Sequence, residues 1–327
     1  MSADRMRTLV AEATLAPSVH NIQPARWRID ADGVTLFDDT RRRLPAADPR
    51  GHDASMSLGA AAEGLRLAAS GAGLRAMAGP ATTESDNSHL RSVTCFRFEE
   101  NGTRDSLVDV VERRQSWRGK FQKPTEADRS AAQALAAEDA TVLVTPDLMR
   151  QTARVLDAAS WRFLSDTPFR RELLSWMRLS RSDSRWNRDG LNAEAMDMSG
   201  VEAVGAGIVL GFAFSFLRRT GLAKPLLAET AKTESATAIV LFHRPIGEDP
   251  FISGGHFYRL WLRIEAAGFS AAVLAALADD AEASAWLAQS AGLPSSHRLV
   301  SAFRIGRRPD GVAYARARLP LEESIVC

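Results

Sequence analysis

The chain has 327 residues, of which 45% are hydrophobic and 25% are charged, so it is long enough for one large core or for two domains. Its 41 Lys and Arg residues and 40 Asp and Glu residues leave a net charge of +1, which gives no overall field to attract nucleic acid or a membrane surface. The two cysteines, Cys95 and Cys327, form neither a CxxC pair nor a pattern with histidine, so we expect no metal site and no disulfide framework.

The start of the chain and its most apolar run bear on where the protein works. Residues 1–18 lack the apolar core of a signal peptide, and the low cysteine content is typical of a reducing compartment, so we expect a cytoplasmic protein. The run Val201–Phe216 includes Glu202 and is shorter than the roughly 20 residues that span a bilayer. We interpret it as a buried helix or a gating segment.

The first part of the chain alternates helical and extended patterns. Apolar residues at Met6, Leu9, Val10 and Ala13 have helical spacing, and Pro17 ends that helix. The predicted elements are a helix over 3–15, a hairpin of residues 26–30 and 34–39, a small-residue helix over 54–71 with Gly71 as its C-cap, and a strand over 89–100.

The second part has a similar order of elements and a longer middle. The predicted elements are a helical segment over 105–113, a helix from Thr125 to about 138, a strand over 141–145, two helices over 148–180 broken at Pro168, a long polar loop over 181–200, a strand over 235–243, a helix over 254–268, a strand over 299–306 and an extended basic tail. Because each part runs from helix through extended segment to small-residue helix and strand, we expect two structurally related halves.

A proline-bracketed turn, LAPSVHNIQPARW at 15–27, places polar side chains between Pro17 and Pro24. The prolines favour an extended or turning backbone. The turn either only reverses the chain or presents Ser18, Asn21 and their neighbours to a ligand.

Two basic clusters could bind an anion. In the segment ERRQSWRGKF, alternation puts Arg114, Ser116 and Arg118 on one face of an extended strand, where guanidiniums and a hydroxyl can grip a phosphate. Arg316 and Arg318 also lie two residues apart. The alternatives are a solvated basic turn and a solubilising tail. There is no dinucleotide fingerprint, P-loop, GxSxG elbow or HExxH motif.

Three segments together resemble the FMN-binding nitroreductase family. APSVHNIQP at 16–24 is similar to its APSxxNxQP segment, RRQSWR at 113–118 to its RxSxR/K segment, and RARLPLEE at 316–323 to its C-terminal segment. The continuation DPRGHDASMSLGAAAEGLRLAA at 48–69 resembles the Acg-like branch in particular. The resemblance implies an α+β fold in which a mixed or antiparallel sheet is flanked by helices.

The order of the segments implies a fused dimer. In short family members RxSxR precedes APSxxNxQP, and FMN lies between two subunits that exchange segments. Here the order is reversed, so we expect two pseudo-symmetric halves in one chain that retain one complete site. Residues 1–104 would supply the PSxxN turn. Residues 105–327 would supply RxSxR and the C-terminal arginines, with a lid-like insertion at about 181–218.

The resemblance also implies roles for individual residues. Arg118 would lie near the flavin pyrimidine, where a positive charge stabilises reduced flavin. The backbone at 270–274 would be a loop facing flavin N5. The implied cofactor-binding residues are Arg114, Ser116, Arg118, Arg316, Arg318, Pro17, Ser18, Asn21, Ala271 and Ala272.

The function implied is that of an FMN-dependent oxidoreductase. Hydride would pass from NAD(P)H through flavin to a small electron acceptor such as a nitroaromatic or a quinone, with no protein residue as acid or base. The alternatives are a flavin-storage protein with a closed lid and little turnover, and a globular protein without flavin. We expect neither nucleic acid nor a membrane as a partner, and either a monomer acting as a fused dimer or a homodimer.

Overall fold

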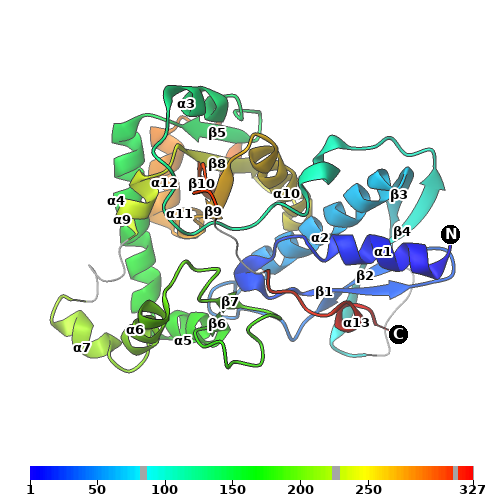
Figure 1. The fold of residues 1–327 in the computed structure, drawn as a ribbon, viewed down its shortest axis with the longest axis horizontal. Coiled ribbons are helices and arrows are strands. Elements are labelled where there is room, and N and C mark those ends of the chain that lie inside the picture. Colours follow the sequence, from blue (N-terminus) through cyan, green and yellow to red (C-terminus); the bar gives the residue numbers. More distant parts are fainter. Residues whose placement is uncertain (82–86, 223–228, 312–315, 327) are drawn as a thin grey trace.

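The computed structural model describes residues 1–81, 87–222, 229–311 and 316–326 as an α+β protein (Figure 1). Cys327 lies outside the described residues. Two four-stranded antiparallel sheets stand at opposite sides of a central pair of helices. None of the helices in the described part of the chain combines the length and the apolarity that crossing a bilayer requires.

The first sheet has the strand order β1-β2-β4-β3, and all its neighbours are antiparallel. Strand β2, inside the sheet, is buried at every residue, whereas β4 combines buried and exposed residues because only part of it meets the core. The elements of this half are α1 (Ala3–Ala13), η1 (Val19–Asn21), β1 (Ala25–Ile29), β2 (Val34–Asp39), α2 (His52–Gly71), β3 (Leu74–Gly79) and β4 (Leu90–Glu100).

The second sheet has the order β5-β8-β10-β9. Strands β8 and β10 are buried along almost their whole length, because both faces of the sheet are covered by helices. The elements after residue 100 are η2 (Ser106–Val110), α3 (Glu126–Gln133), β5 (Ala140–Leu143), α4 (Pro146–Ser165), α5 (Thr167–Trp176), β6 (Met177–Arg178), β7 (Leu191–Asn192), α6 (Gly200–Leu210), α7 (Phe214–Arg219), α9 (Thr230–Glu234), β8 (Ala238–Pro245), α10 (Pro250–Ala266), β9 (Ser270–Val273), α11 (Ala276–Asp279), α12 (Ala281–Ser290), β10 (His297–Gly306) and α13 (Leu321–Ser324).

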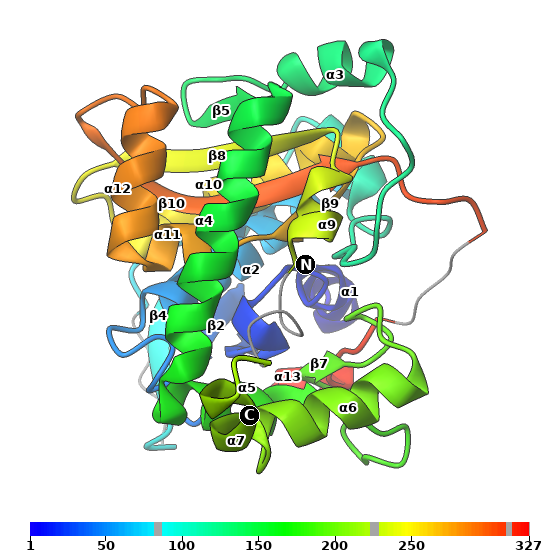
Figure 2. The ribbon, with the colours of Figure 1, turned by 90° about the vertical axis from the view of Figure 1, so that its left-hand side faces the viewer.

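The two halves repeat one topology. In each sheet the strands lie in the order first, second, fourth, third, and a long helix, α2 or α10, separates the second strand from the third. Figure 2 shows α4 crossing the outer face of the second sheet beside α11 and α12. This arrangement confirms the predicted α+β fold with two related halves.

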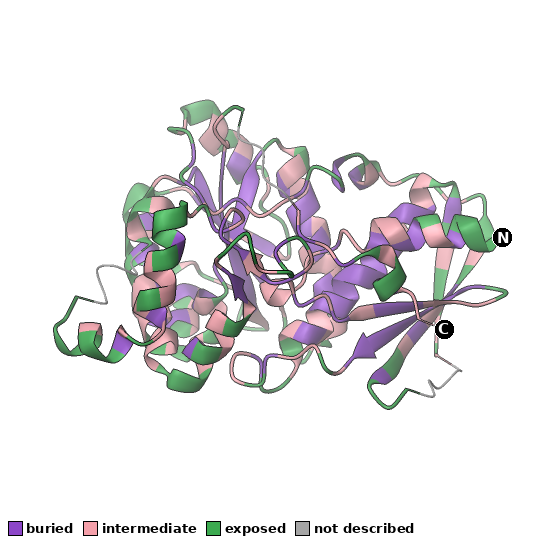
Figure 3. Cartoon of the chain, turned by 60° about the horizontal axis from the view of Figure 1, so that its bottom comes forward, coloured by how far each residue is buried: buried purple, intermediate pink, exposed green. Residues whose placement is uncertain are grey.

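Helices α2 and α10 cross at glycines. A Cβ built on Gly59 would lie 1.8 Å from the carbonyl oxygen of Phe251, and one on Gly254 would lie 2.0 Å from that of Met56. Only glycine allows the two backbones to approach this closely. The crossing brings Tyr258 and Leu262 of α10 into the core of the first half, and the buried residues form a continuous band through both helices (Figure 3).

The end of the chain returns to the first half. Ile325 bridges Trp27 of β1 in parallel, and the amide of Val326 donates a hydrogen bond to the Trp27 carbonyl at 2.8 Å. An exposed ion pair joins Arg7 to Glu322 at 2.8 Å. Residues 316–326 therefore pack on α1 and β1 of the first half, although they follow β10 of the second half in the sequence.

Several predicted boundaries were wrong, each for a local reason. Helix α2 continues through Gly71, and it is Gly73, at φ 73°, that takes the left-handed conformation after it. The break between α4 and α5 falls at Asp166, which N-caps α5, and Pro168 lies in that helix's first turn, where a missing N–H costs nothing. Helix α3 ends at Gln133, five residues before the predicted end at about 138.

The apolar run was wrongly predicted to be a buried helix. Its α6 portion buries Leu210 with Met177 and Met196, and Ala203 in a separate small cluster. Val201, however, is 84% exposed and Val204 is 63% exposed. A helix that is apolar all round can bury only the stripe that meets its neighbours. In the described structure the remaining faces of α6 and α7 lie on the surface.

Candidate functional site

The turn between α1 and β1 has an unusual backbone. His20, Asn21 and Gln23 have φ values of 44°, 55° and 49°, in the left-handed region that disfavours residues other than glycine. Two hydroxyls hold the turn in place. Ser18 Oγ accepts from the Gln23 amide at 2.9 Å, and Ser57 Oγ of α2 accepts from the Val19 amide at 3.1 Å.

The RxSxR segment lies along the edge of β9. Ser116 bridges Ala271 in parallel, and the Trp117 amide donates to the Ala271 carbonyl at 2.8 Å. Ala271 and Ala272 are buried in strand β9, so the loop predicted at 270–274 is instead a strand. Its pairing with β10 requires the extended backbone.

The C-terminal arginines meet the RxSxR segment. Arg316 Nη2 donates to the carbonyl of Arg114 at 2.9 Å, and Arg114 Nη2 donates to the carbonyl of Leu15 at 3.0 Å. The Arg114 guanidinium is buried and lies 4.5 Å from the ring centroid of Trp261, a cation–π distance. Three segments from both ends and the middle of the chain therefore converge here.

Arg318 lies in a cationic environment. Burial, followed by the positive charges of Arg114 and Arg316, lowers its pKa to about 9. Because two further guanidiniums lie near this buried one, an anion added among them would be stabilised. The cluster of Arg114, Arg316 and Arg318 is called the arginine cluster below.

The side chain of Arg318 fixes the turn. Its Nε donates to the Thr14 carbonyl at 2.9 Å and its Nη2 to the Leu15 carbonyl at 3.1 Å, so it caps the C-terminus of α1, where the helix dipole is negative. Its Nη1 donates to Asn21 Oδ1 at 3.0 Å. Arg318 thus couples the C-terminal segment to the proline-bracketed turn.

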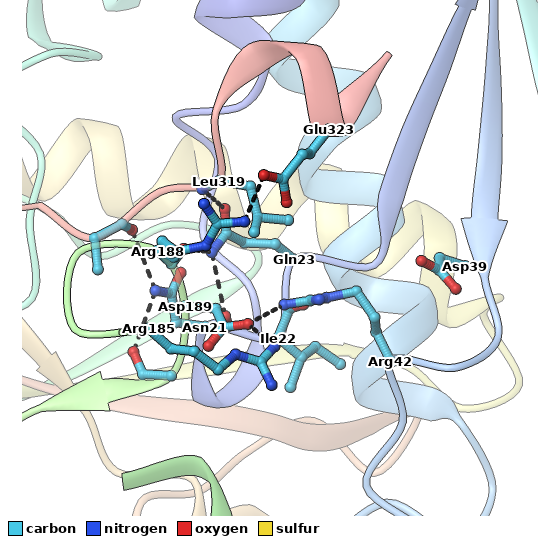
Figure 4. A network of polar contacts seen from close by, with 12 residues as sticks. Asn21, Ile22, Gln23, Asp39, Arg42, Arg185, Arg188, Asp189, Leu319 and Glu323 are labelled. Carbon is cyan, nitrogen blue, oxygen red and sulfur yellow. Dashed lines mark hydrogen bonds and ion pairs between the residues drawn. The ribbon is translucent and has the colours of Figure 1, made fainter. Parts of the chain in front are cut away.

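The segment predicted to be a lid-like insertion, called the insertion below, contacts this turn (Figure 4). Asn21 Nδ2 donates to the carbonyl of Gly190 at 3.2 Å, and Gln23 Nε2 donates to that of Arg188 at 2.8 Å. On the other side, Arg118 Nη1 donates to the carbonyl of Ala195 at 3.1 Å. The insertion therefore contacts both contributions to the site.

A buried carboxylate anchors the insertion. Asp189 is fully buried and pairs with Arg42 at 2.5 Å, with Arg178 at 2.8 Å and with Arg185. Burial opposes ionisation of Asp189, but hydrogen bonds from Arg178 and Arg42 outweigh it and lower the pKa. Arg42 follows β2 and also donates to the Ile22 carbonyl, so Asp189 links the insertion to the first half.

A cavity of about 520 Å³ opens beside the arginine cluster. Glu265 of α10 lines it together with Arg113 and Arg308. Burial raises the pKa of Glu265 to about 6, although Arg308, Arg114, Arg113 and Arg316 act in the opposite direction. The folded protein therefore keeps the Glu265 carboxyl protonated up to a higher pH than the unfolded chain does.

Glu265 predicts a pH-dependent stability. A carboxyl whose pKa is raised in the fold stabilises the fold fully below pH 4.5, and this contribution is lost as pH rises through about 6. Glu265→Gln should match the wild type at pH 4.5 and be more stable at pH 8 by about 1–2 kcal/mol. Denaturant unfolding at both pH values measures this, and an equal difference at both would contradict it.

The structure brings the predicted residues together. Pro17, Ser18 and Asn21 form the turn, Arg114, Ser116 and Arg118 run beside Ala271 and Ala272, and Arg316 and Arg318 join the two sets. The sequence analysis missed Asp189. Its role depends on its pairing with Arg42, Arg178 and Arg185, and only Arg185 is a near neighbour in the sequence. The sequence analysis also assigned no role to His20.

The chain is similar in sequence to curated proteins of Mycobacterium tuberculosis (strain ATCC 25618 / H37Rv), while no family model matches it. It is 30% identical over 182 residues to "Putative NAD(P)H nitroreductase acg". The aligned region covers 54% of this chain and 55% of that protein. A second protein from the same organism, also described as a putative NAD(P)H nitroreductase, is 25% identical over 176 residues, which are 53% of this chain and 51% of that protein. The chain thus spans about half the length of the curated relatives it matches. These relatives confirm the resemblance to nitroreductases, Acg among them.

Solved structures show a weaker similarity. A nitroreductase with bound FMN from Bacteroides fragilis NCTC 9343 is 12% identical with a TM-score of 0.37, covering 66% of this chain and 95% of that one. The FMN-dependent nitroreductase NfnB from Mycobacterium smegmatis in complex with NADPH is 17% identical with a TM-score of 0.36, covering 66% and 96%. The description of the fold therefore rests on the two sheets of this chain.

Proposed function

We propose that this protein is an FMN-dependent oxidoreductase that takes hydride from NAD(P)H and reduces a small electron acceptor such as a nitroaromatic or a quinone. The observation that carries the proposal is the arginine cluster, in which Arg316 donates to the carbonyl of Arg114 and Arg318 donates to Asn21 in a turn supplied by the other half. The names of the mycobacterial relatives support the same activity.

The residues present fit a flavin mononucleotide. Arg114, Arg316 and the hydroxyl of Ser116 offer the charge and the donors that a phosphate takes up. The buried Nδ1 of His20 has no hydrogen-bond partner among the described residues, so the turn retains capacity for a polar ligand. A bound flavin would supply the acceptance and donation of hydride.

The chain's own residues bind, orient and shield. Arg318 holds the turn against α1, and this positions Asn21. Arg118 places a positive charge near His20, where it would stabilise negative charge that develops on a ligand. The insertion, bonded to Asn21 and Arg118 through Gly190 and Ala195, excludes water from the space between them. The two halves form the site within one chain, so we propose that a monomer suffices, and that it works in the cytoplasm.

The second candidate function is storage of FMN with little turnover. It is favoured by the buried Asp189 network, which fastens the insertion over the turn. The two functions differ in whether the insertion releases the site during a catalytic cycle, and this difference can be measured.

Removing Arg114 should abolish stable flavin binding. Incubation with FMN followed by desalting should leave a flavin absorption spectrum on the wild type. Arg114→Ala should raise the Kd for FMN about 10- to 100-fold, since a charge-assisted contact to phosphate is lost. Fluorescence titration measures the change.

Two further variants control this result. Arg316→Ala removes a less buried member of the cluster and should weaken binding in the same direction. Arg75→Ala removes a 63% exposed arginine paired with Glu99 and should have no effect. A wild type that retains no flavin, or an Arg114→Ala protein that binds as tightly as the wild type, would contradict the proposed function.

A further inference from the structure

Between Pro17 and Pro24, the proline-bracketed turn has one polar side chain with a buried atom that finds no hydrogen-bond partner among the described residues. Ser18 Oγ accepts from Gln23, and both ends of the Asn21 amide are bonded, to Arg318 on one side and to Gly190 and Ala317 on the other. The Gln23 amide is also satisfied at both ends, with its Nε2 donating to Arg188 and its Oε1 accepting from Leu319. Between Pro17 and Pro24, His20 Nδ1 is the one side-chain atom that is buried without a hydrogen-bond partner among the described residues.

The backbone of His20 is also in an unfavourable conformation. Its φ of 44° and ψ of 20° are left-handed, where a side chain at Cβ crowds the backbone. Three hydrogen bonds around it, from Val19, Gln23 and Arg318, hold the turn in this shape. Strained residues that the surrounding structure over-determines are concentrated at ligand sites. Strain and an unpaired buried nitrogen thus coincide at one residue.

The charge state of His20 indicates what it would face. Burial, and then the positive charge of Arg118, lower its pKa to about 4, so the imidazole is neutral at pH 7. A neutral imidazole has one donor and one acceptor nitrogen and suits an uncharged polar partner. A phosphate dianion would instead favour the imidazolium, and the arginine cluster already provides for it.

We propose that His20 is a positioning residue that hydrogen-bonds through Nδ1 to an uncharged polar edge of the bound flavin ring system, and that it does not contact the phosphate. This inference rests on the proposed function, because it assigns a further contact at the same site. The residue adds the first half's own hydrogen bond to a cofactor whose phosphate is bound chiefly by the second half.

Two variants separate the hydrogen bond from the strain. His20→Gly relaxes the left-handed backbone and removes the nitrogen. His20→Asn tolerates the same backbone, and its Oδ1 occupies a place close to that of Nδ1 as an acceptor. If His20 served only the turn, both variants would bind flavin as well as the wild type, and both apoproteins would be at least as stable.

The experiment is titration of the apoprotein with FMN and with riboflavin, which lacks the phosphate, followed by flavin fluorescence. His20→Gly should weaken binding of both ligands by the same factor, about tenfold, and His20→Asn should restore most of it. Arg114→Ala should weaken binding of FMN and leave that of riboflavin nearly unchanged. The apoprotein melting temperature of His20→Gly should equal or exceed that of the wild type.

The outcomes distinguish this inference from the proposed function. If the wild type binds neither ligand, the proposed function fails. If the wild type binds FMN and His20→Gly binds it equally well, only the assignment of His20 fails. A loss confined to FMN, with riboflavin binding unchanged, would place His20 at the phosphate and overturn the proposed ring contact.

Discussion

Gly59→Ala should lower the free energy of unfolding by about 3 kcal/mol or more, enough to prevent folding of a marginally stable chain. The added Cβ would lie 1.8 Å from the Phe251 carbonyl oxygen and 2.8 Å from its carbon, so backbone rather than a flexible side chain blocks it. Helices α2 and α10 would have to separate, which opens the core around Tyr258 and Leu262.

Gly205→Ala is the matched control. Gly205 also lies within a helix, α6, and nothing lies within 4 Å of the position of its Cβ. Because alanine favours a helix by about 1 kcal/mol over glycine, this variant should be neutral or slightly stabilising. Urea unfolding of both proteins tests the pair. Equal stability of the two variants would show that α2 and α10 do not meet as described.

Asp189→Asn should destabilise the insertion by about 3–5 kcal/mol, since it removes the charge that compensates buried Arg178. Asp189 is fully buried, and its other partners are Arg42 and Arg185. The loss should be local to the insertion, because both sheets and the α2–α10 contact lie outside the network. Limited proteolysis should therefore cut the region of residues 181–200 sooner than in the wild type.

Glu194→Gln is the control for this second prediction. Glu194 pairs with Arg181, whose side chain is 79% exposed, so its loss should change stability by less than about 1 kcal/mol. The same two variants separate the candidate functions. If the protein stores flavin behind a fixed insertion, Asp189→Asn should speed FMN release and raise turnover with an acceptor. If the insertion already opens during turnover, activity should stay level or fall.

The core elements could be predicted from local patterns. The hairpin of β1 and β2 follows from alternating residues around Gly33, and α2, α10 and β10 follow from periodic apolar positions. These patterns indicate which face of an element is buried, and they can be recognised from the residues of that element alone. The sequence analysis missed the strand β9 and the helix α12. For β9 the reason is its length, because the run Ser270–Val273 has too few residues to show a period.

The exposed face of α6 illustrates the opposite error. The apolar character of Val204 and Ile208 predicts burial, yet in the described part of the chain Val204 is 63% exposed and Ile208 is 42% exposed. The hydropathy of a side chain indicates that its exposure to water is unfavourable, but it does not ensure that another element packs against it. Likewise, the position of the helix break before α5 depended on Asp166 as an N-cap, a signal weaker in sequence than Pro168.

The sequence by itself indicated which residues belong to the candidate site. The three motif segments contain Arg114, Ser116, Asn21 and Arg318, and their order indicated that residues from opposite ends of one chain would have to meet. Only the tertiary structure decided that they do meet and which of them are left with spare hydrogen-bonding capacity. Asn21 and Gln23 are fully bonded to the insertion and the C-terminal segment, whereas His20 is not. Residue type fixes how many hydrogen bonds a side chain can form. The burial and the partners that decide its charge and its remaining hydrogen-bonding capacity come from segments that are about 300 residues away in the sequence.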